Sequence, residues 1–417
     1  YASVGSKIDE IAALSEKSKQ ALEENNIPDA INYISDMSDR LDMLQYRMIR
    51  SSAVENRAAW YRSNEKSDEE VAAVIEKAVS LNINAIYLET WYNGMVIGYS
   101  DDKLIKHHQK AHGDFDALEA FCRVGHQYGV EIHAWVENFF IGTLSNSQEE
   151  DTLVNKTMGR HLIDSQGNAY NRTIYGDYVF LNPYQEENRR LVLNVYREII
   201  QKYDIDGIHL DYIRFPEPNF QKYDFGYNAD IINGFQQAHN TDVNPKQLSK
   251  SDPLYNAWCK FREDIINSWV EEVYHLVKET KPDLWISCAC YPDLDSAPKT
   301  IFQNVRVWLE NGWIDEVFSM SYSADTAFVA ENAQKFAQTV GDKAFYSTGI
   351  MAFGTTTPVD FANQLDAVRD CFANGSAVFS LGSITEDNYY DCMKYGPYSI
   401  KAVQTYKLNK TISAGLT

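Results

Sequence analysis

The chain has 417 residues, of which 44% are apolar and 23% are charged, and these values describe a globular protein rather than a disordered one. Its formal net charge of −21 argues against nucleic acid or an anionic membrane surface as a partner, because both require a basic face. The sequence holds no run of about 18 apolar residues, so no membrane-spanning segment is expected.

Residues 1–52 are predicted to form a separate N-terminal unit, a hairpin of two helices. Apolar residues recur at spacings of three and four over residues 8–22 and again over 31–48. Residues 25–28 interrupt this pattern, and Pro28 suits the first turn of the second helix. Two helices bury too little surface to be stable alone, so we expect the hairpin to pack on another part of the protein. It carries no recognisable catalytic chemistry.

The remaining residues, 53–417, are predicted to form a (β/α)8 TIM barrel of the α/β class. Short β-rich runs alternate here with helical patterns, which is the element order of such a barrel. The expected strands are 57–61, 85–90, 131–136, 207–211, 285–289, 316–320, 345–349 and 377–381. The expected helices are 68–81, 115–128, 186–203, 257–281, 300–311, 327–340 and 357–374. A doubly wound open sheet is the alternative, but residues 62–66 lack the glycine-rich turn that it needs after the first strand.

Three long loops are expected after the second, third and fourth strands, at residues 91–114, 139–184 and 213–256. In a barrel these loops stand at the carboxyl ends of the strands, where substrates bind. They carry many aromatic residues, including Tyr175 and Tyr178, in a chain that is 13% aromatic. Aromatic rings are ordinary core material and are also surfaces for sugar rings. Their number on one rim favours a glycan cleft over a pocket for a small metabolite.

Carboxylates stand at the ends of several predicted strands. Glu89 ends the second, Glu137 follows the third, Asp211 ends the fourth and Asp293 follows the fifth, so all should meet at the barrel mouth. Glycoside hydrolysis needs one carboxyl to protonate the leaving oxygen and another to attack the sugar or activate water. We expect Asp211 to be the nucleophile or base and Glu137 the acid, with Asp293 as its substitute and Glu89 as a substrate binder. For each carboxylate taken singly, a structural ion pair is the alternative.

Other residues near the strand ends are predicted to bind substrate. They are Trp91, Trp135, Asn138, Tyr212, Arg214 and Tyr291. Trp91 and Trp135 are expected to line a sugar subsite. His209 shares the inward face of the fourth strand with Asp211, and we expect it to be a hydrogen-bonded core histidine because a buried polar group needs a partner.

Several motifs resemble, in order, those of the glycosyl-hydrolase-like family-10 group of bacterial proteins. The matching stretches are 57–60, 84–94, 129–136, 180–183, 203–216, 261–262, 312–316 and 320–322. The resemblance implies a TIM barrel that hydrolyses glycosidic bonds, with bacterial cell-wall glycan as the indicated substrate and an extracellular or cell-surface location. It also implies that Asp211, Arg57, Asn182 and Tyr322 line the site.

Two positions depart from the pattern of that group. After the third strand the group usually has Trp-Val-Asn-Pro, whereas this chain has Trp135-Val136-Glu137-Asn138, with an additional carboxylate. After the fourth strand the group usually has two adjacent aspartates, whereas Tyr212 follows Asp211 here. The missing second aspartate leaves open an alternative function, a catalytically inactive barrel that binds carbohydrate.

A third hypothesis is a lyase or aldolase that acts on a small phosphorylated substrate. It requires a glycine-rich phosphate site after the seventh and eighth strands, and residues 349–354 and 382–383 match that pattern only weakly. No metal or cofactor is expected, because the sequence has neither a His-x-His pair nor an HExxH motif for zinc. The expected partner is a carbohydrate substrate, and the sequence gives no indication of an oligomeric state.

Overall fold

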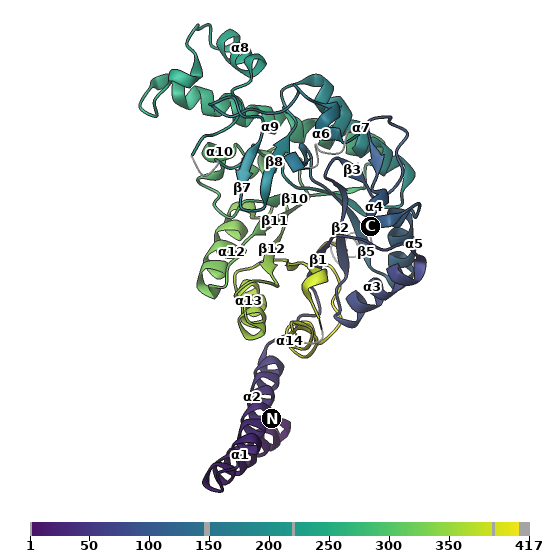
Figure 1. Cartoon of the computed structure of the whole chain (residues 1–417), viewed down its shortest axis with the longest axis vertical. Coiled ribbons are helices and arrows are strands. Elements are labelled where there is room, and N and C mark those ends of the chain that lie inside the picture. Colours follow the sequence, from purple (N-terminus) through teal and green to yellow (C-terminus); the bar gives the residue numbers. More distant parts are fainter. Residues whose placement is uncertain (1, 146–150, 219–221, 386–387, 408–417) are drawn as a thin grey trace.

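The computed structural model describes residues 2–145, 151–218, 222–385 and 388–407. Its centre is a closed barrel of eight parallel strands (Figure 1). The strands are β1 (Asn56–Tyr61), β2 (Ala85–Tyr92), β5 (Glu131–Val136), β9 (Gly207–Leu210), β10 (Trp285–Cys290), β11 (Glu316–Met320), β12 (Phe345–Met351) and β13 (Gly375–Phe379). β1 pairs with both β2 and β13, which closes the barrel and confirms the predicted fold.

Helices follow the barrel strands and surround them. They are α3 (Asp68–Ser80), α5 (Ala117–Tyr128), α7 (Glu186–Lys202), α9 (Pro253–Thr280), α11 (Val305–Glu310), α12 (Thr326–Val340) and α13 (Pro358–Asp370). Several begin with a side chain that accepts a hydrogen bond from a free backbone N–H, such as Ser67 before α3 and Asp325 before α12. The predicted helix at 300–311 is instead divided into α10 (Ala297–Thr300) and α11, because Phe302 takes a left-handed conformation with φ 58°.

Inward-facing side chains fill the barrel, as the alternation along each strand requires. Trp60, Tyr87, Trp135 and Phe318 form an inner cluster with three alanines. His209 lies beside them, where it accepts a hydrogen bond from the indole N–H of Trp60 at 3.0 Å and bonds to Ser287 at 2.8 Å. Burial lowers the pKa of His209 well below its usual value, so it is a neutral core histidine, as expected.

The long loops gather at the carboxyl end of the barrel. The first contains β3 (Met95–Val96), β4 (Lys106–His107) and α4 (Gln109–His112). The second contains α6 (Leu153–Lys156) and a small antiparallel sheet of β6 (Phe140–Thr143), β8 (Gly176–Phe180) and β7 (Asn171–Thr173), in that order. The third contains α8 (Ala229–Ala238) and the 3-10 helix η2 (Pro245–Gln247).

The N-terminal hairpin consists of α1 (Ala2–Glu23) and α2 (Ile27–Met48), and it extends away from the barrel (Figure 1). Its base packs on the barrel: Tyr46 is buried next to Gly396, and Arg50 pairs with Asp366 and Asp370 on α13. Along the described chain, no helix is both long enough and apolar enough to cross a membrane.

Candidate active site

Three carboxyl side chains lie buried at neighbouring strand ends. Glu89 is near the end of β2, Glu137 directly follows β5 and Asp211 directly follows β9; their residues are 0%, 2% and 7% exposed. Val136 pairs with Leu210 in the sheet, and the backbone N–H of Asp211 donates to the carbonyl of Val136 at 2.9 Å. The carboxyl cluster of Glu89, Glu137 and Asp211 therefore forms as expected at the carboxyl end of the barrel, which is the catalytic end of this fold.

Arg62 covers the carboxyl cluster from the loop that follows β1. Its Nε and Nη2 donate hydrogen bonds to the two carboxylate oxygens of Glu89, and Nη2 also lies 3.9 Å from Glu137 Oε1. Burial raises the pKa of Glu89, whereas the bonded guanidinium opposes that rise. Half of the Arg62 side chain is exposed, so it separates the buried Glu89 from solvent.

Glu137 is suited to hold a proton. Burial raises its pKa well above the usual glutamate range, and the neighbouring charges of Glu89 and Asp211 raise it further. Among the described residues, none forms a hydrogen bond with its buried Oε2. A buried carboxyl with an unpaired oxygen is favoured in the neutral, protonated form, which is the form of a general acid.

Asp211 has a different environment, because hydrogen-bond donors face both of its oxygens. The indole N–H of Trp135 donates to Oδ2 at 3.0 Å, and the backbone N–H of Tyr212 donates to Oδ1 at 2.6 Å. Burial raises the pKa of Asp211 to about 6, while these donors and the positive charge of Arg214 limit the rise. Asp211 is therefore ionised near neutral pH.

The side chain of Asn138 does not point into the mouth, where it was predicted to bind substrate. Instead it holds the loop ends beside the carboxyl cluster. Its amide nitrogen donates to the backbone carbonyl of Asp211, and its oxygen accepts from Tyr196 at 2.7 Å and from Trp269 at 2.9 Å. Asn138 and Tyr212 both have positive φ, of 46° and 49°. These hydrogen bonds hold the two turns that direct Glu137 and Asp211 inward.

An aromatic rim surrounds the carboxyl cluster. Arg214 lies over the ring of Tyr212 at 5.2 Å and over that of Tyr291 at 6.0 Å. Tyr322 stacks on Phe379 at 5.3 Å, and burial together with the charge of Asp211 raises its pKa. The structure thus brings Tyr212, Arg214, Tyr291 and Tyr322 to the mouth, as the sequence predicts.

Two predicted site residues lie elsewhere in the fold. Arg57 is at the amino end of its strand, fully buried, where it pairs with Glu55 at 2.9 Å and bonds to backbone carbonyls. It therefore stabilises the end of the barrel opposite the mouth. Asn182 is also fully buried, and it bonds to Asp230 at 3.0 Å and joins the second and third long loops.

Asp293 does not belong to the carboxyl cluster. It is exposed, and its Oδ1 accepts hydrogen bonds from the backbone N–H groups of Asp295 at 3.0 Å and Ser296 at 3.1 Å. The hydrogen bonds from Ser296 lower its pKa, so it is ionised and shapes the turn before α10. This geometry does not suit the role of a substitute acid.

The two tryptophans that were predicted to line a sugar subsite are both buried. Trp91 is 0% exposed and packs in the outer core, because an irregularity between Glu89 and Trp91 shifts the register of β2 against β5 and reverses the alternation. Trp135 is 4% exposed, and its indole N–H donates a hydrogen bond to Asp211. Neither ring offers a free face for a sugar.

Arg62 is the main site residue that the sequence analysis did not assign. It directly follows the first strand, so a search of polar residues at every strand end would have found it. Phe140, Tyr178 and Phe180 also approach the site, from β6 and β8 of the second long loop. Their position depends on the small sheet, which the sequence pattern did not predict.

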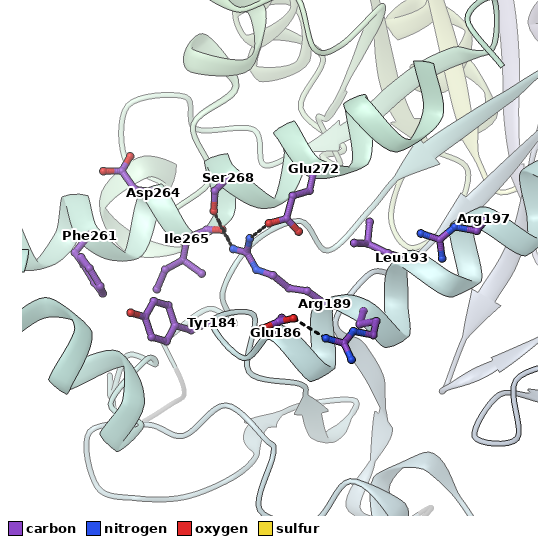
Figure 2. Close-up of a pocket in the computed structure, with 11 residues that line it drawn as sticks. Tyr184, Glu186, Arg189, Leu193, Arg197, Phe261, Asp264, Ile265, Ser268 and Glu272 are labelled. Carbon is purple, nitrogen blue, oxygen red and sulfur yellow. Dashed lines mark hydrogen bonds and ion pairs between the residues drawn. The ribbon is translucent and has the colours of Figure 1, made fainter. Parts of the chain in front are cut away.

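A hollow of about 520 Å³ lies on the outside of the barrel between α7 and α9 (Figure 2). Its central residue, Arg189, donates to the carbonyl of Ile265, to Ser268 and to Glu272. This guanidinium is thus already bonded to α9, and the residues that line the hollow include none of the carboxyl cluster. Within the described ranges, no group of three or more His, Cys, Asp or Glu residues is arranged to hold a metal ion.

The fold and the buried carboxyls define a class of protein, the (β/α)8 barrels with acid–base groups at the mouth. A family model described as glycosyl hydrolase-like 10 matches residues 49–367, so the chain belongs to this family.

Solved glycoside hydrolases have the same fold. The PgaB (BpsB) glycoside hydrolase domain from Bordetella bronchiseptica has 14% identity and a TM-score of 0.64, and the match covers 82% of this chain and 99% of that one. The catalytic domain of a β-amylase from Paenibacillus polymyxa has 10% identity and a TM-score of 0.57, with coverage of 83% and 96%. A β-galactosidase from the haloarchaeon Halorubrum lacusprofundi has 11% identity and a TM-score of 0.61, with coverage of 81% and 57%.

One curated relative is an "S-layer-related protein" from Niallia circulans. It is 25% identical over 182 residues, which cover 41% of this chain. The matched part is only 11% of the length of that relative.

Proposed function

We propose that the protein is a glycoside hydrolase that cleaves a polysaccharide or oligosaccharide, with bacterial cell-wall glycans as the first substrates to test. The observation that carries this proposal is the pairing, at adjacent strand ends, of a carboxyl that favours its proton with one that is ionised. Glu137 has a raised pKa and an unpaired oxygen, whereas Asp211 accepts two hydrogen bonds. Carboxylate glycosidases require such a pair.

In the proposed reaction, Glu137 gives its proton to the glycosidic oxygen as the bond to the sugar breaks. Asp211 acts on the sugar side, either as the base that takes a proton from the attacking water or as the nucleophile that bonds to the anomeric carbon. In the second case water then releases the sugar from Asp211 and gives its proton to Glu137. Glu89 pairs with Arg62, and the negative charge of Glu89 raises the pKa of Glu137, which favours the proton on Glu137. Trp135 and Asn138 hold Asp211 in place.

A cell-surface or extracellular location is part of this proposal. The family membership, the implied cell-wall substrate and the relative called S-layer-related all support it. The test is to fractionate cells that produce the whole protein and to locate the chain with an antibody. Recovery only from the cell interior would contradict the proposed location.

A second candidate is a barrel that binds carbohydrate without cleaving it. The near-complete burial of Glu89 and Glu137 beneath Arg62 favours it, because a substrate would have to displace Arg62 to reach them. The missing second aspartate after Asp211 also favours it.

Both candidates are tested by incubating the protein with bacterial cell-wall glycans and plant glycans and identifying the products by mass spectrometry. The matched control is Glu137→Gln, which keeps the shape of the side chain but has no proton to donate. If the protein is a hydrolase, we expect products from the native protein and a rate about 10²–10⁴-fold lower with the variant. Binding without products would favour the inactive barrel, and equal rates for both proteins would contradict the proposed acid.

A further inference from the structure

A groove of about 400 Å³ lies beside the carboxyl cluster, between the hairpin of β7 and β8 and the loop at 212–218. Residues of the hairpin form one wall and residues of the loop form the other. The volume falls within the range of small-molecule sites, about 300–1,000 Å³.

The hairpin presents apolar surface to solvent at the edge of this groove. Tyr175 is 76% exposed and Ile174 is 75% exposed, and both stand in the turn between β7 and β8. Tyr178, Phe180 and Tyr212 line the same groove with half-buried or buried rings. Exposed aromatic and apolar side chains that gather at a hollow mark a binding surface, and tyrosine combines an apolar ring face with a polar hydroxyl.

The groove is continuous with the carboxyl cluster through stacked rings. The ring of Phe140 stacks on Tyr212 with centroids 5.1 Å apart and contacts Tyr178 at 4.8 Å. Tyr212 lines the groove and directly follows Asp211 in the chain, so the groove lies next to the place of the proposed reaction. A glycan with one unit at the carboxyl cluster would place its next units along these rings.

The two arginines that line the groove are each paired with a neighbouring carboxylate. Arg172 bonds to Asp177 at 3.1 Å, and Arg214 bonds to Glu217 at 3.2 Å. The groove therefore offers polar groups for sugar hydroxyls without a net positive charge. In a chain of net charge −21, this balance disfavours a polyanionic glycan.

We propose that the groove is a subsite for uncharged sugar rings, which stack on Tyr175 and Tyr178 as the substrate extends from the carboxyl cluster. This inference rests on the proposed function, because the reaction at the carboxyl cluster defines the direction in which the substrate extends into the groove. It makes the part of the ligand in the groove a run of neutral sugar units, so the affinity for the protein should increase with the length of a neutral oligosaccharide.

The test measures binding by calorimetry for oligomers of two to six units. The neutral probes are oligomers of N-acetylglucosamine and of glucose, and the charged probe is an oligomer series of galacturonate. Tyr175→Ala is compared with Phe372→Ala, because Phe372 is also highly exposed, at 87%, but lies after α13 and outside the groove. Tyr175→Trp tests whether another aromatic ring restores binding.

We expect longer neutral oligomers to bind the native protein more tightly, and Tyr175→Ala to weaken that binding about 3- to 10-fold, the value of one aromatic contact. Phe372→Ala should bind as the native protein does, and Tyr175→Trp should retain binding. Equal affinity of Tyr175→Ala and native protein, no binding of any neutral oligomer, or tighter binding of galacturonate would each overturn the inference. Tyr175-dependent binding without cleavage would support the subsite and contradict only the proposed hydrolysis.

Discussion

Glu137 and Asp211 are neighbours at the barrel mouth, yet the hydrogen-bond donors around them differ. Two N–H groups, from Trp135 and Tyr212, face the oxygens of Asp211, whereas the buried Oε2 of Glu137 has no partner in the described part of the chain. Donors stabilise a carboxylate and burial without donors stabilises the acid. This difference, more than the presence of two carboxyls, is the reason we propose Glu137 as the acid and Asp211 as the nucleophile or base.

This assignment predicts a bell-shaped dependence of kcat/KM on pH. Asp211 acts when ionised, so activity should be lost as the pH falls through its pKa of about 6. Glu137 acts when protonated, so activity should be lost again as the pH rises through its raised pKa. The measurement is the initial rate at low substrate concentration across the pH range. Full activity at about pH 4, near the ordinary aspartate pKa, would contradict an ionised Asp211.

At single positions, the sequence placed Glu89, Glu137 and Asp211 at the mouth, where the structure has them, but it placed Asp293 and some neighbouring residues there incorrectly. Glu89 and Trp91 were both predicted to lie at the site from their place near the strand end. Unbroken alternation would turn both side chains inward, but the β-bulge between them turns Trp91 outward and leaves no clear mark in the amino-acid pattern. Arg57 belongs to a matching motif, but it is the second residue of β1, and the amino end of a barrel strand lies far from the mouth. Its place in the strand was therefore the better guide.

Among the elements, the barrel strands were predictable because alternation and β-rich composition agree with the barrel fold along this chain. The last strand was predicted two residues late, at 377–381, whereas β13 starts at Gly375. A side chain at Gly375 would collide with the backbone of Asn56, so glycine permits the close contact that closes the barrel. The sheet of β6, β7 and β8 was missed because its strands are short and lie in a long loop.

The N-terminal hairpin is predicted to be dispensable for catalysis. Most of it extends from the barrel, so removing residues 1–43 should leave kcat/KM within about twofold of the full chain, the scatter expected for changes outside the site. Removing residues 1–52 should also lower the free energy of unfolding, by about 3–5 kcal/mol, because the buried ring of Tyr46 is lost. Thermal melts and rates on the same substrate provide both readouts.

The thermal melts and the rates of the two deletion variants must be interpreted together. If the 1–43 deletion melts as the full chain does but has lost its activity, the hairpin contributes to the site and the prediction is wrong. Lower stability with normal activity for the 1–52 deletion would agree with the packed base of α2, where Arg50 pairs with Asp366 and Asp370.

For the whole molecule, the features of the proposed site lie at one end of the barrel. The carboxyl cluster, the aromatic rim and the groove all lie at the carboxyl ends of the strands, while the opposite end holds the buried ion pairs of Arg57 and Arg369 with Glu55. This arrangement follows from the parallel strands, because all of their carboxyl ends lie on the same face of the barrel. The sequence could predict which end is catalytic, but the groove required the spatial contact of two loops.

The central claim is that Asp211 and Glu137 perform the chemistry, and Asp211→Asn compared with Asp293→Asn tests it most directly. The two changes are chemically identical, but Asp211 is buried in the carboxyl cluster and Asp293 is in an exposed turn. On any substrate cleaved by the native protein, kcat/KM should fall about 10²–10⁴-fold for Asp211→Asn and stay near the native value for Asp293→Asn. More than about a tenth of the native activity in Asp211→Asn, a loss below the usual contribution of such groups, would contradict the account.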